Sequence, residues 1–189
     1  MKNLIAISAP SGSGKTTLCR ELQQRNPEIQ FSVSCTTRPK RNYERDGYDY
    51  YFLTDEEFRE LIAEDALVEY ENVHGYFYGT MKKTVDKAVA TGKLLLLEVD
   101  VKGAMSIKEM YPSRTITIFI MPPSIEELKV RLHHRGTDSE ERIKKRMERL
   151  KTELAYKDRF DYVVVNDNIN NATEKLISII NLHTKQKEC

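Results

Sequence analysis

The chain has 189 residues, a length that at roughly 150 residues per domain favours one domain with insertions over two complete domains. Hydrophobic residues make up 40% and charged residues 31%, which excludes a collagen-like, low-complexity or wholly disordered chain. Lysine and arginine number 30 against 29 aspartates and glutamates, so the net charge of +1 indicates no general polyanion-binding surface, and we expect no nucleic-acid partner.

Neither a membrane segment nor a disulfide framework is expected. No apolar run approaches the roughly 18 residues of a membrane span, and the first residues lack a signal-peptide cleavage pattern. Cys19, Cys35 and Cys189 have spacings that fit neither a disulfide framework nor a zinc site. We therefore expect a soluble cytoplasmic protein with reduced thiols and no membrane partner.

The beginning of the chain has the pattern of a strand, a loop and a helix. Leu4 to Ser8 is a short apolar run that is followed by a glycine-rich loop. The segment from Thr16 to about Gln24 then has helical composition. This order is half of a β-α-β unit.

Later segments predict an α/β core. Three predominantly apolar runs, typical of strands in a parallel sheet covered on both faces, fall at residues 94–99, 116–120 and 162–165. Capping-box signals mark helix starts at Thr54 with Glu57 and at Ser124 with Glu127, and Gly92 marks a helix end.

Two stretches depart from this alternation of strands and helices. From about Phe31 to Met81 the chain alternates polar and apolar residues, which predicts a small antiparallel sheet with strands at 50–52, 67–73 and 76–78. Between 125 and 156, two helical segments flank Arg135-Gly136-Thr137 and predict a basic helical hairpin. No linker is long enough to separate independent domains.

The loop after the first strand matches the phosphate-binding pattern G-x-x-x-x-G-K-[ST] except at its first position. It reads Ala9-Pro10-Ser11-Gly12-Ser13-Gly14-Lys15-Thr16, with alanine where the pattern has glycine. Backbone N–H groups at a helix N-terminus bind phosphate, Lys15 can span two phosphates, and the Thr16 hydroxyl suits Mg²⁺. The alternative is a glycine-rich turn before a helix, which the strand and the Lys-Thr offset disfavour.

The apolar strand at 94–99 ends in acids. Glu98 and Asp100 are expected beside the nucleotide phosphates, because ligands of open α/β sheets bind at the carboxyl ends of the strands. Asp100 is a candidate for orienting a metal-bound water. An exposed acid at the start of a turn is the alternative.

Arginines recur at helical spacing on both sides of Gly136. Arg131 and Arg135 are four apart, as are Arg142 and Arg146, so each pair shares a helix face. Solvated surface charge is the simple interpretation of any one of them. Four in a hairpin favour a lid that closes over transferring phosphates and supplies arginine fingers.

The polar motifs of the insertion give a resemblance. The sequence resembles the guanylate kinase family in five motifs that occur in order from residue 4 to about 180. They are S-x-T-T-R-x-x-R from Ser34 to Arg41, D-Y-x-F from Asp49, G-x-x-Y-G-T from Gly75, Arg135-Gly136-Thr137, and Val165-Asn166-Asp167.

The resemblance implies a phosphate-loop nucleoside monophosphate kinase that converts ATP and GMP into ADP and GDP, in purine nucleotide metabolism and GMP recycling. It implies an α/β fold with a parallel core formed by 1–30, 82–124 and 157–189, a GMP-binding insertion at about 31–81, and a lid at about 125–156. The partners would be the small molecules ATP and GMP, with Mg²⁺ as cofactor, and the protein would be a monomer or a homodimer.

The resemblance also assigns residues. The catalytic set would be Lys15, Arg131, Arg135 and Arg146. The ATP site would comprise Ala9, Pro10, Ser11, Gly12, Ser13, Gly14, Lys15, Thr16 and Thr17, with Asn166 and Asp167 near the adenine. The GMP phosphate would meet Arg38, Arg41, Tyr50 and Tyr78. Guanine would meet Glu69, Ser34 and Thr80, with Glu98 and Asp100 facing the acceptor nucleotide and the metal. Mg²⁺ would be held by Thr16 and, through water, by Asp100.

The sequence departs from the family pattern at two positions. Ala9 stands where the pattern has glycine, and Lys102 stands where relatives often have glutamine. A kinase of sugar phosphates on the same scaffold and a non-catalytic binding module are the competing interpretations. Ser34 and Glu69, which suit a guanine edge, argue against the first. The intact Gly14-Lys15-Thr16 argues against the second.

Overall fold

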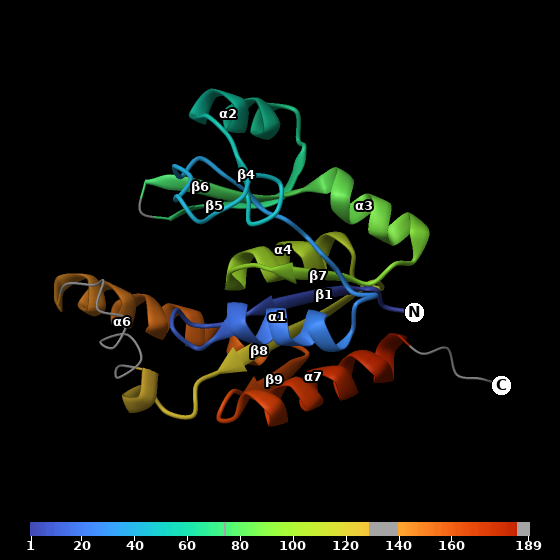
Figure 1. Ribbon diagram of the computed structural model, residues 1–189, viewed down its shortest axis with the longest axis vertical. Coiled ribbons are helices and arrows are strands. Elements are labelled where there is room, and N and C mark those ends of the chain that lie inside the picture. Colours follow the sequence, from blue (N-terminus) through green and yellow to red (C-terminus); the bar gives the residue numbers. More distant parts are fainter. Residues whose placement is uncertain (74, 129–139, 185–189) are drawn as a thin grey trace.

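A five-stranded parallel sheet forms the core (Figure 1). The computed structural model describes residues 1–73, 75–128 and 140–184, without the side chains of 140–147. The strand order is β2-β7-β1-β8-β9, and every pairing in this sheet is parallel. The strands are β1 (Leu4–Ser8), β2 (Gln30–Phe31), β7 (Leu95–Glu98), β8 (Thr115–Met121) and β9 (Tyr162–Val165).

The predicted core strands are confirmed. β1 and β9 have the predicted bounds, while β7 and β8 differ from them by one residue at each end. All five residues of β1 are buried, as expected for a central strand covered on both faces.

Helices cover the two faces of the sheet. α1 (Lys15–Arg25) and α7 (Ile169–Thr184) pack on the face of the sheet to which the side chains of Ile5 and Ile7 point. α3 (Lys82–Thr91) and α4 (Val101–Met110) pack on the opposite face, with Leu4 and Ala6. This alternation along β1 follows the two-residue period of a strand.

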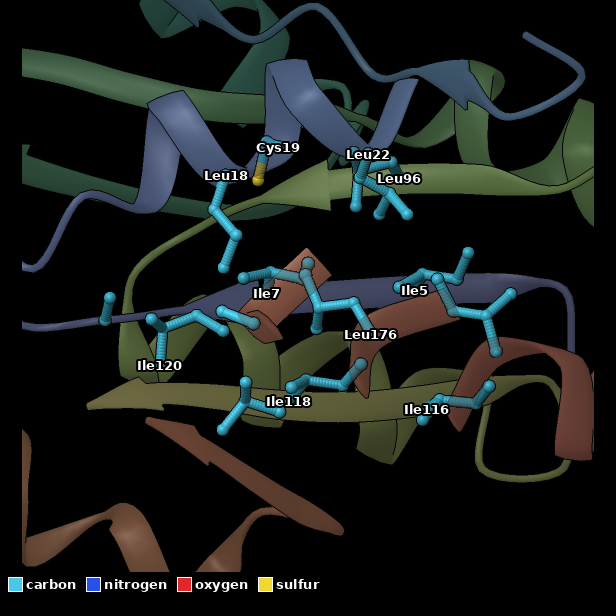
Figure 2. Packing of buried hydrophobic residues seen from close by; sticks show 14 of the residues in the cluster. Ile5, Ile7, Leu18, Cys19, Leu22, Leu96, Ile116, Ile118, Ile120 and Leu176 are labelled. Atoms are coloured by element: carbon cyan, nitrogen blue, oxygen red, sulfur yellow. The ribbon is translucent and has the colours of Figure 1, made fainter. Parts of the chain in front are cut away.

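The cluster between α1 and the sheet fixes the position of that helix. Leu18 and Leu22 of α1 meet Ile5 and Ile7 of β1, and Leu176 of α7 joins them (Figure 2). These five side chains are fully buried, and burial of each contributes about 1.5–3 kcal/mol. Because α1 is held against β1 in this way, the loop that joins them is fixed at both ends.

The segment from 35 to 81 forms a second, four-stranded sheet of order β4-β3-β6-β5. Its strands are β3 (Cys35–Thr36), β4 (Tyr51–Phe52), β5 (Leu67–Val73) and β6 (Tyr76–Met81). The pairings β3-β6 and β5-β6 are antiparallel, as the sequence predicts, and the short pair β3-β4 is parallel. The long connection from β3 to β4 permits the parallel pairing, which a tight hairpin would exclude.

The second sheet has a helix on its outer side. α2 (Asp55–Ala63) begins with the predicted capping box of Thr54 and Glu57 and buries Phe58 against Cys35 and Leu67. Figure 1 shows this helix and the second sheet stacked beyond α4. On the α4 side, Val68 of β5 belongs to the same buried cluster as α3 and α4, so the two sheets share a core.

The chain after β8 returns to the core through helical structure. α6 (Glu140–Ala155) and the short η1 (Lys157–Arg159) lead into β9. Leu150 of α6 packs against Leu128, which belongs to a helical turn that Ser124 caps through the Glu127 amide. The predicted turn at Arg135-Gly136-Thr137 lies outside the described residues. Within the described part of the chain, no helix has the length and apolar character that a membrane crossing needs.

Candidate active site

The loop 9–14 turns through two glycines in the left-handed region. Gly12 has φ 93° and Gly14 has φ 84°, conformations that glycine adopts without steric cost. Gly14 is the N-cap of α1, so the first N–H groups of that helix have no partner within the helix and suit an anion. Among the described residues, Asp65 is the single non-glycine residue with positive φ. Ala9 therefore fits the start of this loop without strain.

Lys15 and Thr16 reach across to the end of β7. The Lys15 Nζ donates a 2.9 Å hydrogen bond to the carbonyl oxygen of Val99 and lies 4.0 Å from Oε1 of Glu98. The Thr16 hydroxyl donates a 2.6 Å hydrogen bond to that same Glu98 oxygen. Because β1 and β7 are neighbours, an ammonium, a hydroxyl and a carboxylate converge at their carboxyl ends.

Asn166 lies against the phosphate loop from behind. Its Nδ2 donates a 2.8 Å hydrogen bond to the Ser13 carbonyl oxygen, and the side chain is buried. A Cβ atom on Gly14 would lie 2.6 Å from this Nδ2, so the close approach requires glycine. Asp167 is exposed, and its Oδ1 accepts from the amide of Asn168. Neither Asn166 nor Asp167 contributes to the lining of the central cavity.

Glu69 of β5 is the partly buried acid of the second sheet. Its Oε1 accepts a 2.6 Å hydrogen bond from the Thr80 hydroxyl. Burial raises the pKa of Glu69 to about 7; nearby Asp100 also raises it, while the Thr80 bond and Lys15 lower it. Glu69 therefore changes its charge near neutral pH.

Tyr50, just before β4, and Tyr78 of β6 contact each other. The rings of Tyr50 and Tyr78 are edge to face, with 5.9 Å between their centroids and an interplanar angle of 71°. Burial, and then the charge of Glu98, raises the pKa of Tyr50 to about 12. Its hydroxyl is therefore neutral at physiological pH and can donate a hydrogen bond to an anion.

Glu44 holds the two predicted phosphate-binding arginines. Arg38 donates from Nη2 to Oε1 at 2.7 Å and from Nη1 to Oε2 at 3.0 Å, the bidentate geometry of an arginine–carboxylate pair. The Arg41 amide donates to Glu44 Oε2 at 2.8 Å. The hydrogen bonds from Arg38 hold the pKa of Glu44 below its usual value. The Arg41 side chain is 58% exposed, so its guanidinium is accessible to a ligand.

Helix α6 approaches both the phosphate loop and the start of α4. Asp100 is the N-cap of α4, with Oδ1 accepting from the Gly103 amide at 2.7 Å, and its Oδ2 lies 3.7 Å from Nη2 of Arg149. Arg149 Nε also lies 3.2 Å from Glu153 Oε1. Burial raises the pKa of Glu153, whereas Arg149 and a hydrogen bond with the Ser11 backbone lower it.

One cavity of about 1120 Å³ connects these parts. Its lining comes from the phosphate loop, the second sheet, the end of β7 and α6. The predicted site residues that line it are Ala9, Pro10, Ser11, Gly12, Gly14, Lys15, Thr16, Thr17, Ser34, Arg41, Tyr50, Glu69, Tyr78, Glu98 and Asp100. Ser13, Arg38, Thr80, Asn166 and Asp167 are outside this lining. Arg131, Arg135 and the side chain of Arg146 lie outside the described residues.

Six further charged residues of the cavity are not among the site residues predicted from the sequence: Arg20, Glu44, Asp49, Glu71, Arg149 and Glu153. The alternation along β5 was a signal for Glu71, which shares a strand face with Glu69 two residues earlier. Helical spacing was a signal for Arg149, three residues after Arg146. Nothing in the local sequence separates Glu44 or Glu153 from an ordinary surface acid.

The oxygen donors at the end of β7 fit a magnesium ion. Mg²⁺ prefers carboxylate and hydroxyl oxygens together with substrate phosphates and water. Thr16 and Glu98 supply a hydroxyl and a carboxylate that already touch each other beside Lys15. The site can therefore hold a metal–phosphate complex between the loop and this strand.

Comparisons with known proteins agree with this geometry. Residues 1–183 match the family model described as guanylate kinase. The guanylate kinase of Thermotoga maritima is 44% identical over 94% of this chain and 85% of its own length, and that of Desulfitobacterium hafniense is 46% identical over 94% and 88%. The crystal structure of guanylate kinase from Anaplasma phagocytophilum superposes with a TM-score of 0.80 at 30% identity, covering 98% of this chain and 88% of that one. The chain belongs to the guanylate kinase family.

Proposed function

We propose that the cavity binds ATP at the phosphate loop and GMP at the second sheet, and transfers the terminal phosphoryl group directly between them. Guanylate kinases convert ATP and GMP into ADP and GDP, and this chain catalyses that reaction. The observation that carries the assignment of residues is that the phosphate loop and the carboxyl of Glu69 face one cavity.

On the donor side, the first amides of α1 surround the ATP phosphates and Lys15 neutralises their charge. Asn166 keeps the loop in shape through its bond to Ser13. Phosphoryl transfer needs positioning and charge neutralisation more than a strong base, so the fixed loop and Lys15 account for the donor half of catalysis.

On the acceptor side, the phosphate of GMP binds the guanidinium of Arg41 and the hydroxyls of Tyr50 and Tyr78. Arg38 does not contact the GMP phosphate directly in this assignment. Its guanidinium is bound to Glu44 and has a side-chain hydrogen bond with Tyr78. In this assignment Arg38 orients Tyr78, while Arg41 makes the direct ionic contact.

The guanine base is recognised by Glu69. Guanine presents two adjacent donors, N1–H and the 2-amino group, and a carboxylate can accept from both. Thr80 holds Oε1 of Glu69 in place, and Ser34 lines the same cavity where the O6 side of the base would lie. Adenine lacks the 2-amino group and has an acceptor at N1, so AMP would leave the carboxylate without hydrogen bonds from the base.

Mg²⁺ is the cofactor that this donor set suits. Thr16 and Glu98 would hold it, with Asp100 acting through water, and when bound it neutralises phosphate charge during transfer. Arg131, Arg135 and Arg146 are assigned to the lid that would close over the phosphates, with the lid at about 125–156, the GMP-binding insertion at about 31–81, and the core formed by the remainder.

The partners in this proposal are ATP and GMP alone, with neither nucleic acid nor membrane, and the protein acts as a monomer or a homodimer in the cytoplasm, where its nucleotides occur. A coupled ADP-release assay with GMP, AMP, CMP and UMP tests the substrate assignment. ADP release that depends on GMP and is absent with the other three supports it. Equal release with a pyrimidine nucleotide, or none with GMP, contradicts it.

A further inference from the structure

Helix α4 begins directly against the carboxyl group of Glu69. Gly103, in the first turn of this helix, is buried. A Cβ atom on Gly103 would lie 2.7 Å from Oε2 of Glu69, 3.0 Å from Cδ and 3.1 Å from Cγ. Non-bonded carbon atoms are at their best separation at about 3.5–4.0 Å, so a methyl group and this carboxyl cannot both keep their positions.

The backbone gives no reason for glycine at this position. The glycines with positive φ in the described chain are Gly12, Gly14, Gly47, Gly75 and Gly92, so Gly103 has a conformation that alanine also adopts. In a helix interior, glycine costs about 1 kcal/mol relative to alanine. Helix stability alone therefore favours alanine, and the feature that occupies the space is the Glu69 side chain.

Glu69 cannot withdraw without losing its orientation. Oε1 is bound to the Thr80 hydroxyl at 2.6 Å on one side, while Oε2 faces the first turn of α4. The partial positive charge of a helix N-terminus favours a carboxylate in this place. A methyl group at 103 would push Oε2 away and rotate the carboxyl plane relative to Thr80.

We propose that Gly103 is a specificity-determining residue that positions the Glu69 carboxylate for guanine by leaving space for it. The inference rests on the proposed function, in which Glu69 accepts hydrogen bonds from guanine N1–H and the 2-amino group. Gly103 itself makes no contact with the base. It acts through Glu69 alone.

The first test is Gly103→Ala. Because a displacement of about 1 Å can cost about 10²-fold, we expect kcat/KM for GMP to fall by about 10- to 100-fold. The KM for ATP remains at its wild-type value. IMP lacks the 2-amino group, so the preference for GMP over IMP narrows. Glu109→Ala is the control, since Glu109 is an exposed residue of the same helix, at the end opposite to Gly103.

A double-mutant cycle separates positioning from a general effect on the helix. In the Glu69→Ala background the methyl group meets no carboxylate, so Gly103→Ala has no further effect on kcat/KM for GMP. If Gly103→Ala lowers the melting temperature, Glu69→Ala must restore it for the same reason. Absence of that restoration contradicts the inference.

The inference is overturned if Gly103→Ala keeps the wild-type kcat/KM for GMP, or lowers it by the same factor with and without the Glu69 carboxyl. These results leave the proposed function intact provided that Glu69→Ala alone impairs GMP phosphorylation. If Glu69→Ala has wild-type efficiency with GMP, the guanine-reading role fails first, and the role of Gly103 fails with it.

Discussion

Oε1 of Glu98 accepts a 2.6 Å hydrogen bond from the Thr16 hydroxyl, although the two residues are far apart in the chain. Asp100, two residues further on, turns its Oδ1 to the amide of Gly103 and its Oδ2 toward Arg149. Of these two acids, Glu98 is therefore the one that contacts Lys15 and Thr16. This contact makes Glu98 the stronger candidate for the metal–phosphate complex.

We expect Glu98→Gln to raise the Mg²⁺ concentration that half-maximal activity requires more than Asp100→Asn does. Glutamine keeps an oxygen that can accept from Thr16 and loses the charge, so the Mg²⁺ concentration for half-maximal activity should rise by about 10- to 100-fold. Asparagine remains a good N-cap, so Asp100→Asn preserves the start of α4. Titration of each variant with Mg²⁺ at saturating nucleotides measures the difference. A larger shift for Asp100→Asn would contradict this ranking.

Lys15→Met should abolish most of the activity and leave the fold unchanged. The variant removes the charge beside the phosphates together with the bond to Val99. We expect kcat to fall by at least about 10²-fold, the scale for one preorganised electrostatic donor. Lys83→Met, at an exposed position of α3, is the control and should keep wild-type turnover. A Lys15→Met enzyme with more than a tenth of wild-type kcat would argue against the phosphate-loop assignment.

Asn166→Ala should destabilise the conformation of the phosphate loop, because it removes the side-chain amide that binds the Ser13 carbonyl oxygen. The change leaves the Ser13 carbonyl without this donor and costs about 1–3 kcal/mol of unfolding free energy. The KM for ATP rises, while the KM for GMP stays near wild type because the second sheet is unaffected. Asn171→Ala, an exposed position on α7, serves as the control in denaturant unfolding and kinetics. An unchanged KM for ATP would show that the loop keeps its shape without Asn166.

The sequence predicted the core more completely than the site, for a physical reason. The apolar runs of β1 and β9 could be bounded from local sequence alone, because strands of a parallel sheet are rich in apolar residues. β1 is buried on both faces, whereas β9 lies at the edge of the sheet and leaves Val163 and Val165 exposed. The phosphate loop could also be identified from local sequence, because its pattern lies within eight consecutive residues, 9–16. The parallel pairing of β3 with β4 depends on the path of a long connection, which residue patterns do not encode.

Site contacts between distant segments were less predictable. The side-chain amide of Asn166 donates to the Ser13 carbonyl oxygen, a contact that the resemblance to the family did not indicate. The link from Arg149 to Asp100 joins α6 to α4, and no local pattern indicates which helical arginine makes it. Glu44 acquires its role only because the chain folds it beneath Arg38.

The pKa of Glu69 predicts how GMP use depends on pH. Only the ionised carboxyl accepts from both guanine donors, so kcat/KM for GMP should rise with pH and level off above about 7, the pKa that burial gives this group. One pH unit below that pKa, about a tenth of the carboxyl is ionised, so the value at pH 6 should be roughly tenfold below the plateau.

Glu69→Gln is the control for this profile. The GMP phosphate also titrates, near pH 6 for a phosphate monoester, and it does so equally with both enzymes. The ratio of wild-type to Glu69→Gln kcat/KM therefore isolates the carboxyl and should increase from pH 5.5 to 8. A ratio that does not vary with pH would mean that Glu69 is already ionised throughout this range.

The central claim is that the protein phosphorylates GMP and that Glu69 recognises the guanine base. Its most direct test is the ratio of kcat/KM for GMP to kcat/KM for AMP, measured as ATP-dependent formation of GDP from GMP and of ADP from AMP. A site built to hydrogen-bond a substrate group rejects an analogue without it by about 10⁴-fold, so we predict a wild-type ratio of that order. In Glu69→Ala the ratio should collapse through loss of GMP efficiency, with the KM for ATP unchanged. A wild-type enzyme that phosphorylates AMP as efficiently as GMP, or a Glu69→Ala enzyme with the wild-type ratio, would contradict the role of Glu69.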